Sequence, residues 1–465
     1  MSTPNTSLPS IPSLYALFRK SLSGENQDYT TGSIRRAVFL LSIPMILEMC
    51  MESVFAVVDI FFVGRISRDA VATVGLTESV LTLVYSVAVG LSMAATALVA
   101  RRIGEKNPAA ASRAAAQALL IGLAVTVLVS IAGVVWAPDI LKIMGASPAV
   151  VASGSSFTRI IFAGSAVIML LFLINGIFRG AGNASTAMWS LWIANGFNIL
   201  LCPVMIHYFG LRGAAIATTI GRGTGVCFQC YHLLRGKGRV RLLGSYFIPE
   251  AKLIRSILSI AWTGTMQFLI GSASWIAMVR IISSFGSVTV AGYQVAIRIL
   301  LFFLLPAWGM SNAAATLVGQ NLGAGQPGRA EQSVWASAKY NAIFMAFVSL
   351  LFLLASEPIV GFMNRDPGVQ RVAAEALHIV SLGYICFGIG MVLTNAFNGA
   401  GDTRTPTIIN LFCFWALQIP LAYWLSIPVG MGARGVFGAI LVAETLVTLS
   451  SWLVFRRGGW KKTSL

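Results

Sequence analysis

The stretch from Ala37 to Gly64 sets the strongest limit on how this chain can fold, because it is apolar and yet carries three carboxylates. At about 27 residues it is long enough to cross a bilayer with some tilt. On a helix with about 100° per residue, Glu48, Glu52 and Asp59 lie within about 40° of one another. An ionised carboxylate at mid-membrane costs roughly 2.5 to 3.5 kcal/mol. The acidic stripe must therefore face a wet cavity, hold protons, or be satisfied by neighbouring helices.

Composition indicates that the whole chain is a membrane protein. Of its 465 residues, 57% are hydrophobic and 11% are charged, whereas soluble domains are about 25% charged. The net charge of +17 falls mainly in short loops between apolar stretches rather than on a polar domain. We therefore expect the positive charge to report membrane topology, and we expect the lipid bilayer rather than nucleic acid as the partner.

Twelve apolar stretches, each bounded by Gly, Pro or charge, predict an all-α polytopic membrane protein with twelve transmembrane helices. The spans are expected at 37–64, 71–100, 115–137, 157–178, 187–208 and 213–234, then at 255–282, 288–318, 334–355, 372–397, 406–427 and 435–455.

The spans fall into two groups of six. A polar tail at 1–33, with no cleavable signal, precedes a six-helix bundle at 34–234. A basic linker at 235–254 leads to a second six-helix bundle and a short tail at 255–465. Most of the Lys and Arg residues fall on the side shared by the linker and both tails. The positive-inside rule then predicts that both termini are cytoplasmic.

The two halves are copies of one another. A shift of 219 positions lays Gly90-Leu-Ser-Met-Ala-Ala-Thr-Ala-Leu-Val on Gly309-Met-Ser-Asn-Ala-Ala-Ala-Thr-Leu-Val. The same shift lays Gly180-Ala-Gly-Asn on Gly399-Ala-Gly-Asp. Because six spans is an even number, both copies enter the membrane from the same side, so a pseudo-twofold axis along the membrane normal should relate them. A cleft between two bundles, with alternating access by rocking, is expected.

The copies differ in their acidic residues. Under the same shift, the three carboxylates of the first span meet Gln267, Gly271 and Met278. Glu78 adds a fourth carboxylate to the first half, in its second span, whereas only Glu444 lies deep within a span of the second half. We therefore expect proton or sodium coupling to reside in the N-terminal bundle.

Several other classes of protein are excluded by what the sequence lacks. All six cysteines fall within apolar spans, which argues against a disulfide framework. A membrane-embedded transferase or protease would need paired metal ligands or a nucleophile with a base, and neither is present in the sequence. An ATP-driven pump would need a partner subunit, because this chain has no nucleotide-binding motif. The sequence thus predicts a transporter rather than an enzyme, with no cofactor.

Short motifs in a fixed order carry a resemblance to a known family. They are Ile43-Pro44, Val58-Asp59-Ile-Phe-Phe-Val-Gly64, Arg179-Gly-Ala-Gly182, Gly213-Ala-Ala-Ile-Ala-Thr218, Gln294-Val-Ala-Ile, Gly319-Gln-Asn-Leu-Gly-Ala324 and Gly399-Ala-Gly-Asp-Thr403. From about Ser33 to Arg457 the chain resembles the multidrug and toxic compound extrusion (MATE) family. Because Gly271 and Phe387 stand where one branch keeps carboxylates, it is more similar to the DNA-damage-inducible prokaryotic branch.

This resemblance implies a function and a location. The chain would be a proton- or sodium-coupled antiporter that exports amphipathic, often cationic compounds across the inner membrane of a prokaryote. We expect it to act as a monomer. A lipid-linked saccharide or lipid flippase of the same superfamily is the alternative. A basic cleft would favour the flippase, whereas the acidic stripe favours the export of cations.

The resemblance also implies site residues. The coupling-ion site, for H⁺ or Na⁺, would use Asp59, Asn198, Cys202, Ala214 and Thr218. Members of the family commonly carry Asp at the position of Cys202, and a thiol supplies no carboxylate, so Glu48 or Glu52 is expected to replace that acid. The resemblance places Glu52 and Asn175 near the substrate, and we add Glu48 as a third residue of the substrate cavity.

Overall fold

The computed structural model describes residues 11–24, 27–235 and 238–465, and these residues fold into helices joined by short loops. Predictions for the first ten residues of the tail, and for 25–26 and 236–237, lie outside the described residues. The first half contains α1 (Ile11–Leu22), α2 (Ile34–Gly64), α3 (Arg68–Gly104), α4 (Pro108–Val135), α5 (Ala137–Ile143), α6 (Pro148–Ala163), α7 (Ser165–Gly180), α8 (Ala184–Phe209) and α9 (Leu211–Arg235).

The second half repeats this order. It contains α10 (Ala251–Ile282), α11 (Ser287–Gly323), α12 (Pro327–Met363), α13 (Pro367–Ser381), α14 (Tyr384–Ala400), α15 (Arg404–Asn410), the π-helical η3 (Leu411–Gln418), α16 (Ile419–Ser426) and α17 (Ala433–Arg456). Three short 3₁₀ turns lie at Gly244–Phe247, Ser283–Phe285 and Gly459–Lys462.

The number of spans agrees with the sequence. Among the described residues, nine helical segments are long and apolar enough to cross a membrane, and the bent pair of α13 and α14 makes a tenth. Helices α2 and α9 complete the twelve, and they are the two that bring charged side chains together in the site described below. The predicted all-α fold with twelve spans in two bundles is confirmed.

Glycine contacts reveal the twofold relation between the halves. A Cβ atom on Gly104 of α3 would lie 2.0 Å from the backbone oxygen of Gln320 in α11. A Cβ atom on Gly323 of α11 would lie 2.1 Å from the backbone oxygen of Arg101 in α3. The shift of 219 positions carries Gly104 onto Gly323 and Arg101 onto Gln320. The twofold axis therefore exchanges the two contacts. Helices α3 and α11 therefore meet backbone to backbone at the axis.

Helix breaks and helix starts recur at the same shift in both halves. The fourth span is interrupted in both halves, at Gly164 between α6 and α7 and near Gly383 between α13 and α14, where the bend is 60°. Asn183 and Asp402 precede α8 and α15, and each accepts a hydrogen bond from the backbone N–H three residues later, at 3.2 Å in both cases. The side chain of Asp402 thus caps a helix start.

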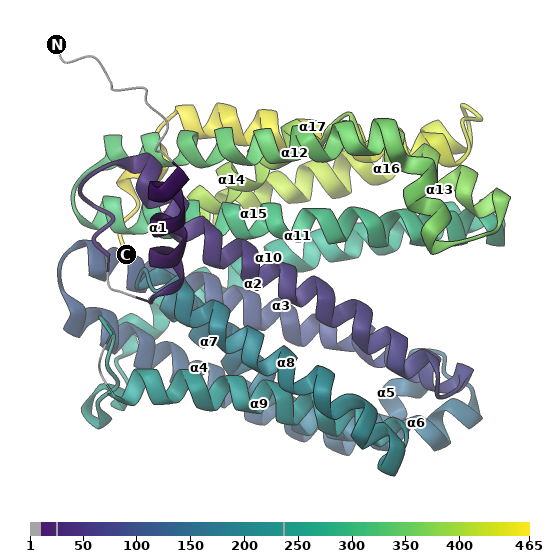
Figure 1. The fold of residues 1–465 in the computed structure, drawn as a ribbon, viewed down its shortest axis with the longest axis horizontal. Coiled ribbons are helices and arrows are strands. Elements are labelled where there is room, and N and C mark those ends of the chain that lie inside the picture. Colours follow the sequence, from purple (N-terminus) through teal and green to yellow (C-terminus); the bar gives the residue numbers. More distant parts are fainter. Residues whose placement is uncertain (1–10, 25–26, 236–237) are drawn as a thin grey trace.

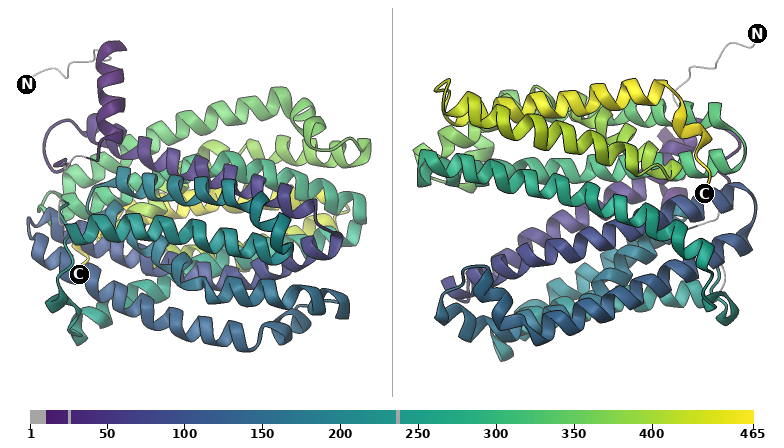
Figure 2. Two further views of the ribbon diagram at one scale, coloured as in Figure 1. Left: turned by 60° about the horizontal axis from the view of Figure 1, so that its bottom comes forward. Right: turned by 180° about the vertical axis from the view of Figure 1, so that it is seen from behind.

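The two bundles lie side by side and are not parallel (Figure 1). They converge at the end where both termini lie and diverge toward the end that carries α5, α6 and α13, as the view from behind in Figure 2 also shows. Helix α2 packs on α11 and α3 packs on α10, so each half contacts the other through its first two spans.

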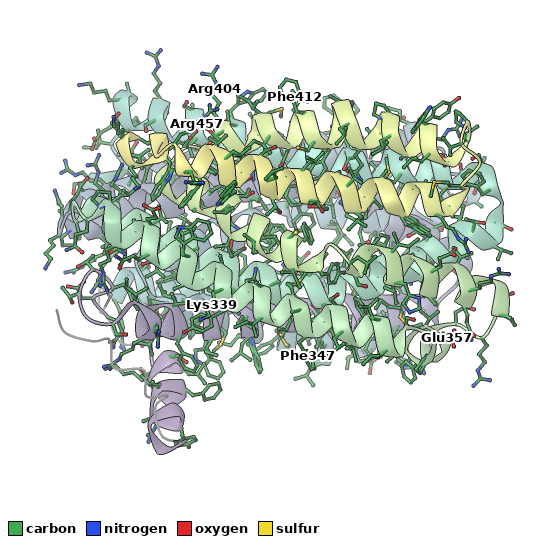
Figure 3. The ribbon with its side chains drawn as sticks, turned by 90° about the horizontal axis from the view of Figure 1, so that it is seen from above. Lys339, Phe347, Glu357, Arg404, Phe412 and Arg457 are labelled. Atoms are coloured by element: carbon green, nitrogen blue, oxygen red, sulfur yellow. The ribbon has the colours of Figure 1, made fainter. Side chains whose placement is uncertain are left out.

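Charge is distributed unevenly along the long axis of the molecule. Seen from above, Lys339, Arg404 and Arg457 lie toward the end that holds the termini, whereas Phe347 and Phe412 lie in the middle (Figure 3). Both phenylalanine side chains are exposed, as expected for a surface that faces lipid. The three basic residues therefore lie at the end that carries both termini, and the cytoplasmic location of that end stays a prediction.

The segment after α1 joins the two bundles at this end. The Arg329 guanidinium of α12 donates hydrogen bonds to the carbonyl oxygens of Thr31 and Gly32, both at 2.8 Å, and of Tyr29 at 3.2 Å. The Tyr29 hydroxyl donates to the Gly182 carbonyl oxygen at 3.3 Å, next to the start of α8. Residues 29–32 therefore bridge α12 and the turn between α7 and α8.

Gly104→Ala and Gly323→Ala should force the α3 and α11 backbones apart, because each new Cβ atom would overlap a carbonyl oxygen. Overpacking of this kind typically costs about 1 to 3 kcal/mol, so we expect a lower Tm for the purified protein in detergent. Gly75→Ala in α3 is the control, since its new Cβ atom would meet no described atom within 4 Å. Equal losses in all three variants would show that the crossing is not unusually close.

Candidate functional site

A cavity of about 260 Å³ lies between the two bundles. Its walls come from α2, α3, α7 and α8 of the first half and from α10, α11 and α14 of the second. All three residues predicted for the substrate cavity, Glu48, Glu52 and Asn175, lie on its wall. The second half contributes Phe268, Leu305, Trp308, Asn312, Ala315, Asn395, Asn398 and Gly399. One wall thus carries charge, and the other carries aromatic and amide groups.

Glu48 is held by two residues of α7. It is 2% exposed, and its Oε1 atom accepts a hydrogen bond from Asn175 Nδ2 at 3.0 Å and lies 3.6 Å from Arg179 Nη1. Asn175 and Arg179 are one turn apart on α7, so both reach α2. The Asn175 oxygen in turn accepts hydrogen bonds from Ser190 at 2.9 Å and Gln229 at 2.6 Å. This network fixes Asn175 and balances the charge of Glu48.

Glu52 lies one turn further along α2 and binds a second arginine. Its Oε1 atom accepts a hydrogen bond from Arg222 Nη2 of α9 at 3.1 Å, and its Oε2 atom accepts one from Asn195 Nδ2 of α8 at 3.1 Å. Arg222 is 2% exposed and lies over the Phe55 ring, 5.1 Å from its centroid. Among the described residues, Arg222 Nε and Nη1 have no hydrogen-bond partner. The guanidinium group can therefore donate hydrogen bonds to a second carboxylate.

A second cavity, of about 50 Å³, lies inside the first bundle. Asp59, Ala214 and Thr218, three of the five residues predicted for the coupling site, line it together with Glu78 and Arg222. The buried Oδ1 atom of Asp59 has no hydrogen-bond partner in the part of the chain that the structure describes. Two carboxylates and one guanidinium group thus surround one small space.

The other two predicted coupling residues lie on α8, beside this cavity rather than on its wall. Asn198 Nδ2 donates a hydrogen bond to Thr218 Oγ1 at 2.9 Å, and the Thr218 hydroxyl donates to the Ala214 carbonyl oxygen at 3.0 Å. Cys202 is fully buried one turn beyond Asn198. Asn198 therefore reaches the cavity through Thr218, and Cys202 packs behind it.

Two side chains, those of Tyr85 and Arg222, contact both cavities or their wall residues. Tyr85 lines both of them, and Arg222 lines the small cavity while it binds Glu52 on the wall of the large one. A change in charge at Asp59 can therefore act on Glu52 through a single side chain.

The sequence predicts an acidic stripe, and the structure shows that most of its charge is compensated. Arginines on neighbouring helices compensate the charges of Glu48 and Glu52, in line with one of the three interpretations, although Glu48 Oε2 has no hydrogen-bond partner among the described residues. Asp59 faces a cavity. Sequence reasoning missed Arg179 and Arg222 as the partners. An arginine within an apolar span costs as much as a carboxylate, so Arg222 could have been found by the same argument as the acids.

Glu78 is also part of the site, although the sequence analysis gives it no role. It lines the Asp59 cavity from α3. Over the described ranges, no three His, Cys, Asp or Glu side chains come together as a metal-binding group.

Comparisons with known proteins agree with the duplicated fold. The MatE family profile matches residues 44–204 and 265–424, one match in each half. A probable multidrug resistance protein NorM of Thermotoga maritima is 24% identical over 461 residues, which cover 97% of each chain. A crystal structure of a MATE protein in complex with MaL6 has a TM-score of 0.89 at 24% identity and covers 94% of this chain and 99% of that chain. A MOP-superfamily transporter of Pyrococcus furiosus, described as having a binding pocket of reverse polarity, has a TM-score of 0.87 at 25% identity, with 94% and 98% covered.

The ion pair between Glu52 and Arg222 predicts coupled effects of two substitutions. Arg222→Met leaves Glu52 without its cation, and breaking one side of a buried pair costs about 3 to 5 kcal/mol. Adding Glu52→Gln should recover part of that loss, because neither charge is then left unpaired. The Tm values of the wild type, both single variants and the double variant in detergent complete the cycle.

The control cycle uses the more exposed pair of Glu375 and Arg434. A pair of this kind is worth about 0 to 1 kcal/mol, so Arg434→Met and Glu375→Gln should change the Tm little. Strictly additive losses for Glu52 and Arg222 would contradict the pairing.

Proposed function

The chain belongs to the MatE family, and on that premise we propose that it exports amphipathic small molecules by alternating access, driven by a cation that moves in the opposite direction. Its relatives are named as transport and resistance proteins, in agreement with a transporter rather than an enzyme. They do not favour the flippase alternative. The observation that supports coupled export is Arg222, which serves both the large cavity and the Asp59 cavity.

Arg222 can couple the two cavities electrostatically. When Asp59 is ionised, two carboxylates compete for one guanidinium group, and the free Nε and Nη1 atoms give Asp59 a donor to attract. At an effective dielectric of about 20, two unit charges 4 Å apart interact by about 4 kcal/mol. Movement of Arg222 toward Asp59 therefore leaves Glu52 available to a cationic substrate.

A proton on Asp59 reverses this arrangement. The neutral side chain no longer attracts Arg222, so the guanidinium group remains on Glu52 and compensates its charge. Binding of a proton at Asp59 and binding of a cationic substrate at Glu52 then oppose each other. This opposition is the thermodynamic requirement for antiport, because each ligand lowers the affinity for the other by the same factor.

We propose a proton rather than sodium as the coupling ion. Sodium would need several oxygen ligands near Asp59, and Cys202 supplies a thiol where the family pattern has a carboxylate. Arg222 also lines the Asp59 cavity and places a positive charge beside any metal ion there. A proton needs only the carboxylate itself.

The cavity between the bundles provides the path for the substrate. The bundles converge at the end that carries the termini and diverge at the other end (Figures 1 and 2). Rocking about the crossing of α3 and α11 would open the cavity to alternate sides. We propose that the basic end faces the cytoplasm, that the chain lies in the inner membrane of a prokaryote, and that it works as a monomer.

Asp59→Asn tests the coupling directly. The amide keeps the size of the side chain but cannot release a proton, so we expect efflux of a cationic dye from proteoliposomes to fall to the rate seen without a gradient. Binding of the dye by the purified variant should be weaker but still measurable, because the neutral amide leaves Arg222 on Glu52 as a protonated Asp59 would. Asp69→Asn is the matched control, because Asp69 is exposed at the start of α3.

The pH gradient and the sodium gradient are imposed separately in this assay. We expect the pH gradient alone to drive efflux by the wild type and by Asp69→Asn. If Asp59→Asn transports as fast as the wild type under a pH gradient, coupling does not occur at Asp59. If only the sodium gradient drives the wild type, the coupling ion is sodium.

A further inference from the structure

The second bundle contains a carboxylate within a membrane-spanning helix, Glu444, that the coupling mechanism does not use. Glu444 lies in the middle of α17, partly exposed to the interior of the bundle. Among the described residues, no hydrogen bond or ion pair holds its carboxylate, in contrast to Glu48 and Glu52. A charge of this kind within a membrane needs a compensating partner.

Glu444 lies on the wall of two neighbouring cavities. It lines a cavity of about 250 Å³ and a smaller one of about 20 Å³, and Trp275, Leu304 and Phe387 line both. The larger cavity shares Met93, Leu305, Trp308 and Asn395 with the cavity between the bundles. The larger cavity therefore borders the cavity between the bundles, and Glu444 lies on its wall.

The groups that face Glu444 carry no positive charge. Among the described residues, Tyr384 of α14 and Cys413 of η3 are titratable side chains close to Glu444, and neither of them carries a positive charge. On α13, Glu375 binds Arg434 and His378 is hydrogen-bonded to Ser356.

The remaining helices that pack on α17 likewise offer no cation to Glu444. Arg404 of α15 and Tyr423 of α16 are exposed, and Arg404 lies toward the end that carries the termini (Figure 3). From α10, the side chains on the cavity wall are those of Gln267 and Trp275. Over the described ranges, no protein cation lines the cavity beside Glu444.

Two polar atoms near this cavity also lack partners. Gln267 is 7% exposed, and its Oε1 atom has no hydrogen-bond partner within residues 11–24, 27–235 and 238–465. The buried hydroxyl of Tyr384, on the wall of the smaller space, is unpartnered among the same residues. Buried polar groups are usually satisfied, so unpartnered ones in a cavity point to a ligand.

The walls indicate the chemistry of that ligand. Four aromatic side chains surround the larger cavity, and Glu444 is the one charged side chain on its described wall: the aromatic residues are Trp275, Trp308, Phe387 and Phe414. Aromatic faces attract cations by about 0.5 to 2 kcal/mol each. A cation with apolar substituents can place those substituents against the aromatic side chains and its charge near Glu444.

We propose that this cavity is a second binding subsite, for a lipophilic monovalent organic cation whose charge lies at Glu444 and whose apolar groups lie against Trp275 and Phe387. The inference rests on the proposed export function for its role in transport. The subsite itself is a separate claim, because it involves neither Asp59 nor Arg222.

Equilibrium binding of tetraphenylphosphonium to the purified full chain tests the subsite. Glu444→Gln should weaken this binding about tenfold or more, equivalent to about 1.4 kcal/mol or more, because it removes the counter-charge but keeps the shape. Glu357→Gln is the matched control: the same change at an exposed position of the same half (Figure 3). Binding of neutral triphenylphosphine oxide should be unchanged in both variants.

A second pair of variants keeps the test independent of Glu444. Trp275→Leu should also weaken tetraphenylphosphonium binding, whereas Trp262→Leu, on the same helix but 65% exposed, should not. Unchanged affinity in Glu444→Gln, or an equal loss for the neutral compound, would overturn the subsite even if proton-driven export holds. Failure of Asp59→Asn to stop efflux would overturn the coupling mechanism and leave the subsite intact.

Discussion

The need to compensate charge inside a membrane-spanning bundle determines how the first half is assembled. Glu48 ties α2 to α7, and Glu52 ties α2 to α8 and α9. Because α2 must present both carboxylates to their arginines, its rotation about its own axis is fixed. The same rotation turns Asp59 into the small cavity beside Arg222. One electrostatic constraint thus produces both a stable helix arrangement and a carboxylate with an unpartnered oxygen.

Duplication supplies the frame on which the two halves diverge. The symmetric glycine contacts of α3 and α11, the interrupted fourth spans and the capped helix starts recur at the same shift in both halves. The charges do not recur. The first bundle pairs Glu48 and Glu52 with arginines, whereas Glu444 in the second bundle lies among aromatic residues. We propose that the first bundle binds the coupling proton and that the second bundle binds part of an organic cation.

Much of the fold could be predicted because its signals are local or periodic. Apolar spans, the repeat and the cap at Asp402 can be read along the chain. Pairings between distant residues could not, since Glu52 and Arg222 are 170 positions apart and no local pattern links them. Asp59, Ala214 and Thr218 were identified by family resemblance, and the structure brings them to one cavity. Cys202 is fully buried and does not line that cavity, although it lies one turn from Asn198 on α8.

The central claim is that Arg222 links a proton at Asp59 to a cation at Glu52. The most direct measurement is the release of protons when a saturating lipophilic cation binds in weakly buffered solution. Glu444→Gln is present in every protein compared, so that the second bundle does not contribute. We expect the Glu444→Gln protein to release a proton for each cation bound, and we expect no release after Asp59→Asn or Arg222→Met. Equal proton release in all three proteins, or none in the first, would contradict the link.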